Sequence, residues 1–266
     1  MTAAGPATTR EALARLAPEH DAFVGIDSDG CVFDTMESKQ KRCFHPLIIK
    51  HWGLEAIAQQ VRETAEFVAL YSQHRGTNRF PALALTFDLL RPRPEVRAAS
   101  VRLPRLEALR RFIESGVPLG EPALERATAE TGDPELASVL EWSRAVNAAI
   151  AGGAADTPPF SGAREALEAL ARRADTACVS QTPEAALVRE WRQHGLLHTV
   201  RAIAGQELGS KSDHLRLAAG GKYAPDRILM IGDAPGDYRA AQSVGARFYP
   251  ILPGREAEAW ERLARE

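Results

Sequence analysis

Two pairs of aspartates stand directly after two short apolar runs of the sequence. Asp27 and Asp29 follow the run FVGI, and Asp233 and Asp237 follow the run ILMIG. Side chains two positions apart in extended backbone face the same way, and α/β sheets bind ligands at the carboxyl ends of their strands. Four carboxylates at one edge repel one another unless a hard divalent cation neutralises them, and Mg²⁺ suits oxygen ligands. The spacing therefore predicts a magnesium site formed by Asp27, Asp29, Asp233 and Asp237.

An aspartate after a strand also occurs for reasons unrelated to metal binding. Such a residue often forms a turn or caps the next helix, and this alternative stays open for both pairs. A calcium loop of the EF-hand type does not fit the first pair. Cys31 occupies a position at which that loop needs an oxygen ligand, and the preceding segment has a strand pattern rather than a helical one.

The elements that must position these side chains follow from the hydrophobic periodicity. Short apolar runs predict strands, and residues between them show helical spacing, which together indicate a Rossmann-like parallel sheet with helices on both faces. The expected strands are residues 23–27, 176–180, 200–205, 228–232 and 246–251. Residues 36–155 have helical spacing almost throughout, as at Leu54, Ile57, Val61 and Val68.

The single sheet is thus interrupted by a long helical insertion. We expect residues 1–35 and 156–266 to form the α/β core domain and residues 36–155 to form an inserted all-helical domain. Residues 156–162 (DTPPFSG) would return the chain to the core. Residues 1–20 fit either a short packing helix around Leu13 and Leu16 or a tail.

Composition excludes several classes of protein. The 266 residues are 45% hydrophobic and 26% charged, which suits a globular protein, and the net charge of −2 gives no basic field for nucleic acid or an anionic membrane. No apolar run approaches the roughly 20 residues that span a bilayer, and the first residues lack a secretory pattern. Three scattered cysteines favour neither a disulfide framework nor a zinc site. We expect a cytoplasmic protein that binds neither nucleic acid nor membrane; its oligomeric state stays open.

Four short motifs resemble those of the haloacid dehalogenase (HAD) superfamily, in the same order. They are DSDGCVFD (27–34), VSQT (179–182), GSKSDHL (209–215) and IGDAPGD (231–237). The resemblance covers the sheet domain, about half of the chain. The insertion lies where this family carries a helical cap, between the first and second motifs.

The resemblance implies phosphoryl transfer through an aspartyl-phosphate. Asp27 would be the nucleophile, and Asp29 the general acid and base. The backbone carbonyl of Asp29 would bind Mg²⁺ together with Asp27 and Asp233, and Asp237 would orient these ligands or bind through water.

Two further positions carry family roles by the same resemblance. The hydroxyl of Ser180 would donate to a phosphoryl oxygen, although a serine there could simply cap the next helix. Lys211 would bridge the nucleophile and the phosphoryl group. An ordinary exposed lysine is the alternative, and Lys222 is the rival candidate, although it stands closer to the following strand.

Charge is distributed unevenly over the helical insertion. Residues 36–111 carry 14 Lys and Arg against 7 Asp and Glu, which suits an anionic substrate, although most such charges only solvate helix faces. In residues 74–80 (HRGTNRF), a turn presenting Arg75 and Arg79 could bind a carboxylate or a second phosphate. With Gln181 of the second motif, these are the candidate substrate contacts.

The leading hypothesis is therefore a magnesium-dependent phosphatase acting on a small phosphorylated metabolite. A sugar phosphomutase of the same superfamily is the main alternative, because it also has an aspartate two residues after its nucleophile. A dehalogenase or a phosphonate-cleaving enzyme is disfavoured, since similar members lack an acid at the position of Asp29. A non-catalytic binding module that keeps the fold also stays open.

Overall fold

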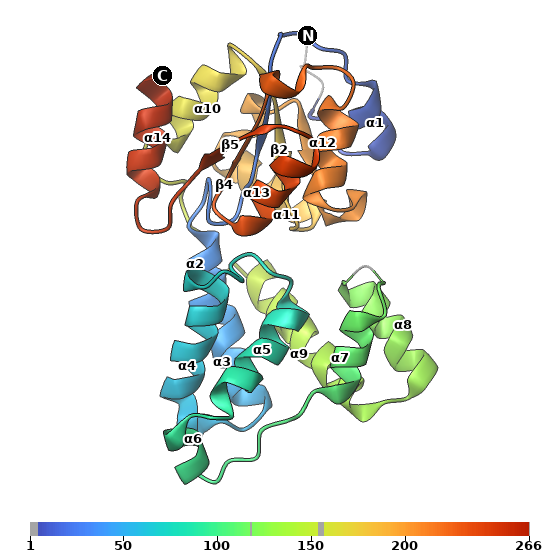
Figure 1. The fold of residues 1–266 in the computed structure, drawn as a ribbon, viewed down its shortest axis with the longest axis vertical. Coiled ribbons are helices and arrows are strands. Elements are labelled where there is room, and N and C mark those ends of the chain that lie inside the picture. Colours follow the sequence, from blue (N-terminus) through green and yellow to red (C-terminus); the bar gives the residue numbers. More distant parts are fainter. Residues whose placement is uncertain (1–4, 118, 154–156, 266) are drawn as a thin grey trace. The chain divides into compact units, whose positions relative to one another are not determined.

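The computed structural model describes residues 5–117, 119–153 and 157–265. The chain forms two compact units, which Figure 1 shows together with their helices and strands. The core unit comprises Met1–Met36 and Thr157–Glu266, and the helical unit comprises Glu37–Asp156. The division proposed from sequence places its second boundary at residues 155 and 156, which lie outside the described residues.

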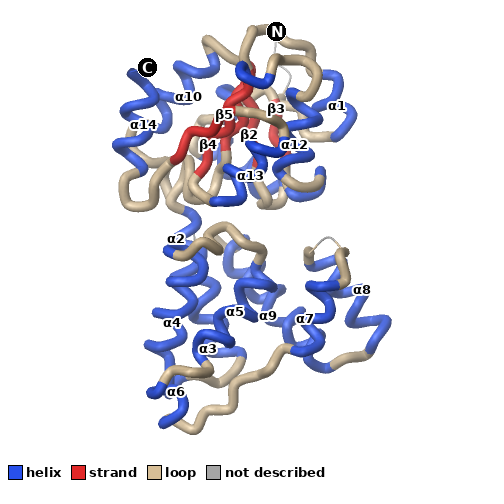
Figure 2. Tube along the Cα trace, in the orientation of Figure 1, coloured by secondary structure: helices blue, strands red, loops and turns tan. Residues whose placement is uncertain are grey.

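A five-stranded parallel sheet, in the order β3-β2-β1-β4-β5, forms the centre of the core unit. Its strands are β1 (Phe23–Ile26), β2 (Asp175–Val179), β3 (Ala202–Ala204), β4 (Ile228–Gly232) and β5 (Arg247–Pro250). In Figure 2 these strands lie within the core unit, and the drawn part of the helical unit contains helices and loops alone. Ile26 at the end of β1 pairs with Cys178 on one side and with Ile231 on the other. The residues that follow β1, β2 and β4 therefore emerge at one edge.

Side chains of the sheet alternate between two apolar clusters. Val24 and Ile26 face one cluster, which includes residues of α10 (Ala163–Ala171), α11 (Glu184–Gln193) and α14 (Glu256–Arg265). Phe23 faces a second cluster with residues of α1 (Arg10–Arg15), α12 (Lys211–Ala219) and α13 (Pro235–Ser243). Figure 1 shows α10 and α14 on one side of the sheet and α12 and α1 on the other. The alternation with a period of two is what a sheet covered on both faces requires.

Six α-helices of the described residues belong to the core unit. They are α1 (Arg10–Arg15), α10 (Ala163–Ala171), α11 (Glu184–Gln193), α12 (Lys211–Ala219), α13 (Pro235–Ser243) and α14 (Glu256–Arg265). The predicted Rossmann-like fold class is confirmed. The packing-helix alternative for the N-terminal segment is also correct, since Leu13 on α1 is fully buried. Ala7 pairs with Ala202 and so covers the outer edge of β3.

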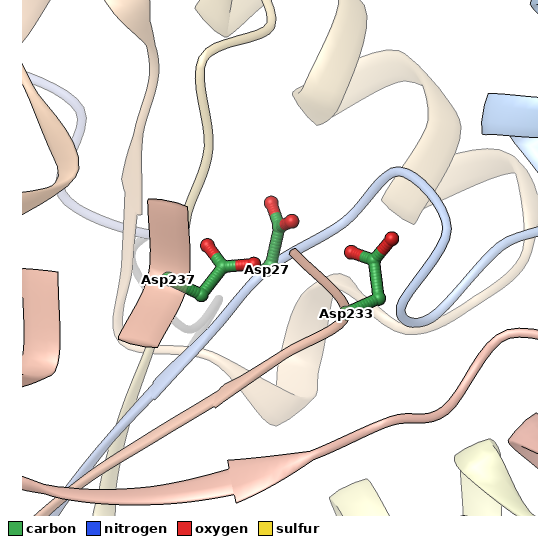
Figure 3. A group of neighbouring side chains, drawn as sticks. All are labelled: Asp27, Asp233 and Asp237. Carbon is green, nitrogen blue, oxygen red and sulfur yellow. The ribbon is translucent and has the colours of Figure 1, made fainter. Parts of the chain in front are cut away.

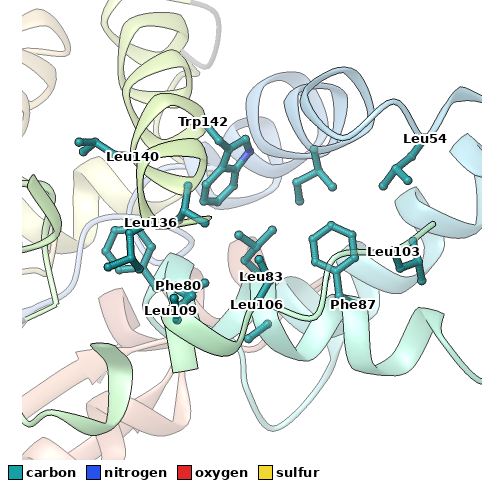
Figure 4. Packing of buried hydrophobic residues seen from close by; sticks show 14 of the residues in the cluster. Leu54, Phe80, Leu83, Phe87, Leu103, Leu106, Leu109, Leu136, Leu140 and Trp142 are labelled. Atoms are coloured by element: carbon teal, nitrogen blue, oxygen red, sulfur yellow. The ribbon is translucent and has the colours of Figure 1, made fainter. Parts of the chain in front are cut away.

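The helical unit is built around one large apolar cluster. Its helices are α2 (Thr35–Lys39, which begins in the core unit), α3 (His45–His51), α4 (Ala58–Glu66), α5 (Arg79–Leu90), α6 (Pro94–Ala98), α7 (Glu107–Glu114), α8 (Glu121–Thr131) and α9 (Pro134–Ala151). Two π-helical turns, Gln40–Phe44 and Phe67–Tyr71, extend α2 and α4. Figure 4 shows Phe80, Phe87 and Trp142 among the leucines of this cluster. The prediction of an inserted all-helical domain is confirmed for the described residues.

None of the helices in the described ranges combines the length and apolar character needed to cross a membrane.

Candidate functional site

Backbone pairing between β1 and β4 brings the two aspartate pairs to one edge of the sheet. The Asp27 amide continues the ladder beyond β1 by donating to the Ile231 carbonyl at 2.9 Å. Asp233 directly follows β4, and Asp237 lies in the first turn of α13. The two strands are neighbours, so residues about 200 positions apart in the sequence emerge side by side.

Three of the four aspartates form a buried cluster. Oxygens of Asp27, Asp233 and Asp237 all lie within 4.8 Å of one another, and Figure 3 shows the three side chains gathered at one place. The residues are 3%, 8% and 0% exposed, respectively. Oxygen donors alone, buried and this close, suit a hard divalent cation such as Mg²⁺.

Lys211 bridges two members of this cluster. Its Nζ lies 2.8 Å from Asp27 Oδ2 and 2.5 Å from Asp237 Oδ1. Burial acts to lower the pKa of the ammonium, but the carboxylates of Asp237 and Asp27 outweigh it and raise that pKa above its ordinary value. Lys211 therefore stays charged at the site. The alternative of an exposed lysine is wrong.

The helix that carries Lys211 begins directly before it. Ser210 is the N-cap of α12 and forms a capping box with Asp213, which fixes where the first helical side chain points. The rival Lys222 instead donates to the carbonyls of Leu13 and Leu217 at 2.9 and 3.3 Å. Lys222 thus helps to hold the N-terminal segment, and the structure favours Lys211 as the site lysine.

The cluster brings three carboxylates together with the ammonium of Lys211. Burial raises the pKa of Asp27 well above its ordinary value, Lys211 opposes this effect, and Asp237 and Asp233 add to it. One ammonium cannot neutralise three carboxylates. A divalent cation would remove the excess negative charge, and the donor set therefore fits Mg²⁺.

Gly232 permits the close approach of α13 to the end of β4. A Cβ atom at Gly232 would lie 2.4 Å from the carboxyl carbon of Asp237, far inside van der Waals contact. The Asp237 carboxylate also accepts from the Ala234 amide at 3.0 Å. Asp237 therefore caps the start of α13 and also belongs to the carboxylate cluster, so both interpretations of this aspartate are correct.

The fourth aspartate, Asp29, lies outside the group of three and is held by two threonines. Thr35 Oγ1 donates to its Oδ1 at 2.5 Å, and Thr182 Oγ1 donates to its Oδ2 at 2.7 Å. Our sequence reasoning did not select either threonine. Their positions relative to the motifs were the sequence features that could have identified them. Thr182 is the last residue of the second motif, and Thr35 directly follows the first.

The second motif supplies two more of the predicted residues. Ser180 is buried at the end of β2, and its Oγ accepts from the Thr182 amide at 3.2 Å. It does not cap the next helix, because α11 has Pro183 at its N-cap. Gln181 Nε2 donates to the Gly209 carbonyl at 2.9 Å and so ties this loop to the loop before Lys211.

The two predicted arginines are both engaged within the helical unit. Arg75 is buried and donates to the Leu70 carbonyl at 3.0 Å. Nη1 of Arg79 contacts Ser143 Oγ at 3.1 Å and Asn147 Oδ1 at 2.7 Å, and its guanidinium lies 5.3 Å from the centre of the Phe44 ring. The prediction that one turn presents both arginines is wrong, because Arg79 is the first residue of α5.

No family model and no curated protein matches the sequence. Solved structures do match, at low identity. A candidate haloacid dehalogenase-like hydrolase from Bacteroides fragilis is 14% identical, with a TM-score of 0.52 over 91% of this chain and 93% of that chain. A candidate phosphoglycolate phosphatase from Lactobacillus delbrueckii subsp. bulgaricus is 16% identical, with a TM-score of 0.50 over 86% and 84%. The chain has the haloacid dehalogenase (HAD) fold. In this HAD fold the cluster lies at the carboxyl ends of β1 and β4, the edge at which open α/β sheets bind ligands.

Proposed function

We propose that this chain is a magnesium-dependent phosphatase that hydrolyses a phosphate monoester of a small metabolite through an aspartyl-phosphate on Asp27. The observation that carries the proposal is the contact of Lys211 with both Asp27 and Asp237 inside a buried group of three carboxylates. A buried ammonium beside a candidate nucleophile is suited to stabilising the negative charge of a transferring phosphoryl group.

Asp27 would form the new bond to phosphorus while the ester oxygen leaves with the electrons of the broken P–O bond. Two donors fix its carboxylate, namely the Ser28 amide at 2.8 Å from Oδ1 and Lys211 Nζ at 2.8 Å from Oδ2. The ammonium would neutralise charge on the carboxylate and on the phosphoryl oxygens, and the buried Ser180 hydroxyl would donate to one of those oxygens.

The residues that would hold Mg²⁺ are Asp27, Asp233 and Asp237, together with the backbone carbonyl of Asp29. When bound, the ion would supply positive charge that offsets the carboxylates and the phosphoryl oxygens.

Asp29 would move the protons of both half-reactions. It would give a proton to the departing ester oxygen, and it would then accept a proton from the water that attacks phosphorus and releases phosphate. Thr35 and Thr182 donate to its two oxygens and so fix the plane of the carboxyl group. A fixed carboxyl group can serve both steps without reorientation.

The leaving group would be recognised by Arg75, Arg79 and Gln181. The excess of basic residues in positions 36–111 favours a substrate with a second anionic group. The similar structure from Lactobacillus is named as a candidate phosphoglycolate phosphatase. A small phosphorylated acid of that kind therefore belongs among the first compounds to test.

A panel of phosphate esters tests the proposal. Phosphorylated sugars, polyols, sugar acids and nucleotides, with a generic aryl phosphate, are incubated with and without Mg²⁺, and phosphate release is measured. We expect turnover that requires Mg²⁺ and falls by about 10³-fold or more in Asp27→Asn. Asp226→Asn, an exposed aspartate, is the matched control.

Three results would contradict the proposal, either in its activity or in its nucleophile. Conversion of a hexose 1-phosphate to the 6-phosphate without phosphate release would indicate a phosphomutase. Calorimetric Mg²⁺ binding that is lost in Asp233→Asn, without hydrolysis of any ester, would indicate a binding module. Equal turnover by the wild type and Asp27→Asn would exclude Asp27 as the nucleophile.

A further inference from the structure

Two buried tryptophans donate hydrogen bonds into the loop that follows β1. Trp191 on α11 donates from Nε1 to Ser28 Oγ at 3.0 Å. Trp260 on α14 donates from Nε1 to the Cys31 carbonyl at 2.8 Å. Both indoles are fully buried, and their partners are 163 and 229 positions away in the sequence. Two helices from the last third of the chain therefore hold one short loop near its beginning.

The loop itself is compact and closely packed. The Ser28 carbonyl accepts from the amides of Val32 and Phe33 at 2.9 and 3.1 Å, and Gly30 allows the turn with a φ of 76°. The Phe33 ring packs edge-on against the Trp191 ring, with centroids 6.0 Å apart. A loop bonded in this way moves as one piece, so a shift at its indole contacts would displace all of it.

Ser28 stands between the proposed nucleophile and the proposed acid and base. Side chains of successive residues in extended backbone alternate in direction, and Ser28 Oγ contacts Trp191 and Glu190 Oε2, on α11, whereas the Asp27 carboxylate joins the cluster. Ser28 lies between Asp27 and Asp29 in the chain, and the hydrogen bond from Trp191 therefore holds the residue that joins them.

We infer that Trp191 and Trp260 are positioning residues for the nucleophile loop. Neither touches the carboxylate cluster or Lys211 through a hydrogen bond described for it, so each acts through the loop. The inference rests on the proposed function, because it assigns the indoles a role in the same site. A buried indole N–H without an acceptor costs free energy, and these two have their acceptors in the loop. The packing of α11 and α14 therefore also fixes the position of the loop.

A third tryptophan provides a matched control. Trp142 in the helical unit is as deeply buried as Trp191 and Trp260, at 1% exposure, but among the described residues its Nε1 has no hydrogen-bond acceptor. Replacing Trp by Phe removes ring volume at all three positions. It removes a hydrogen bond at Trp191 and Trp260 alone.

The test compares Trp191→Phe, Trp260→Phe and Trp142→Phe at a temperature at which circular dichroism shows each variant fully folded. We expect kcat to fall about tenfold in Trp191→Phe and somewhat less in Trp260→Phe, with KM changed by less than about twofold. Trp142→Phe should keep the wild-type kcat. In calorimetry with Mg²⁺ alone, the dissociation constant should rise in Trp191→Phe and stay unchanged in Trp142→Phe.

A double variant identifies the bond responsible. Ser28→Ala removes the acceptor, so Ser28→Ala/Trp191→Phe should lose no more kcat than the worse of the two single variants. Strictly additive losses, or a Trp191→Phe kcat and Mg²⁺ affinity equal to those of Trp142→Phe, would overturn the inference. Failure of the proposed function is a separate result, because it is seen as absence of ester turnover in the wild-type protein.

Discussion

The core unit and the helical unit use buried polar side chains in different ways. In the core unit, Asp27, Asp233 and Asp237 come from two distant segments and lie together, and Lys211 contacts Asp27 and Asp237. In the helical unit, the polar groups of Arg79 contact residues of α9 and stabilise the packing of the unit itself. Convergence of like charges costs stability unless a ligand is bound. Charged side chains that come together from distant segments are therefore a better sign of a functional site than an excess of charge within one segment.

The same contrast explains which sequence signals were informative. An aspartate after a strand has its place fixed by the sheet, so its neighbours can be foreseen. An arginine in a helical segment can reach many partners with its long side chain, and its charge alone does not identify them. The following predictions test this contrast, from the largest expected effect to the smallest.

Among the variants below, Lys211→Met should cause the largest loss. Removing the ammonium takes away the cation that bridges Asp27 and Asp237, so kcat for the best ester should fall about 10²- to 10³-fold. Lys222→Met is the matched control, because Lys222 is also partly buried but contacts backbone carbonyls. Steady-state kinetics of both variants with Mg²⁺ provide the measurement. A greater loss in Lys222→Met than in Lys211→Met would reverse our assignment of the site lysine.

Asp175→Asn should affect stability rather than chemistry. Asp175 begins β2, at the opposite end of that strand from Ser180. Burial acts to raise its pKa, but hydrogen bonds from Tyr223, the backbone amides of Glu19 and His20, and Arg201 outweigh burial and lower that pKa. The stabilisation is therefore present above the unfolded pKa of about 3.9 and is lost as pH falls toward the lower folded value.

The Asn variant should accordingly lose about 2–3 kcal/mol of unfolding free energy at pH 7. The difference from the wild type should shrink as pH falls from 7 to 3, past the unfolded pKa of about 3.9, because the unfolded wild-type chain then takes up a proton that the folded carboxylate does not. Urea unfolding at both pH values measures this change. A difference that grows with acidity would show that Asp175 is not stabilised as the carboxylate.

Thr182→Val should lower kcat about tenfold, because it removes one of the two hydroxyl donors to Asp29 at nearly constant volume. Thr182→Ser keeps the hydroxyl and should restore most of the activity. Thr86→Val in the helical unit, where the hydroxyl donates to the Ala82 carbonyl, is the control for loss of a buried hydroxyl. If Thr182→Val kept the wild-type kcat, the Thr182 hydroxyl would have no role in the function of Asp29.

Arg79→Gln should give the smallest effect and tests the helical unit directly. If Arg79 contacts substrate in addition to Ser143 and Asn147, KM should rise about fivefold with little change in kcat. Arg144→Gln, an exposed arginine paired with Glu125, is the control. A lower unfolding temperature with an unchanged KM would show that Arg79 has a purely structural role.

The sequence by itself determined the fold class and the edge of the sheet at which the cluster forms. Apolar runs define strands through local backbone geometry, and parallel strands place the residues that follow them at a common edge whatever the intervening chain does. Asp27, Asp29, Asp233 and Asp237 were therefore grouped from their spacing, and the structure brings three of them together while the Asp29 side chain lies outside the group. The order of the four motifs indicated the HAD fold that the solved structures share.

Only the tertiary structure decided which of several possible partners each polar group has. It selected Lys211 over Lys222, gave Thr35 and Thr182 to Asp29, and placed Trp191 against Ser28. These contacts join segments up to 184 residues apart, as Lys211 and Asp27 are, and hydrogen bonds require distances near 3 Å. Such distances depend on how helices pack on the sheet, and no local pattern in the sequence encodes that packing.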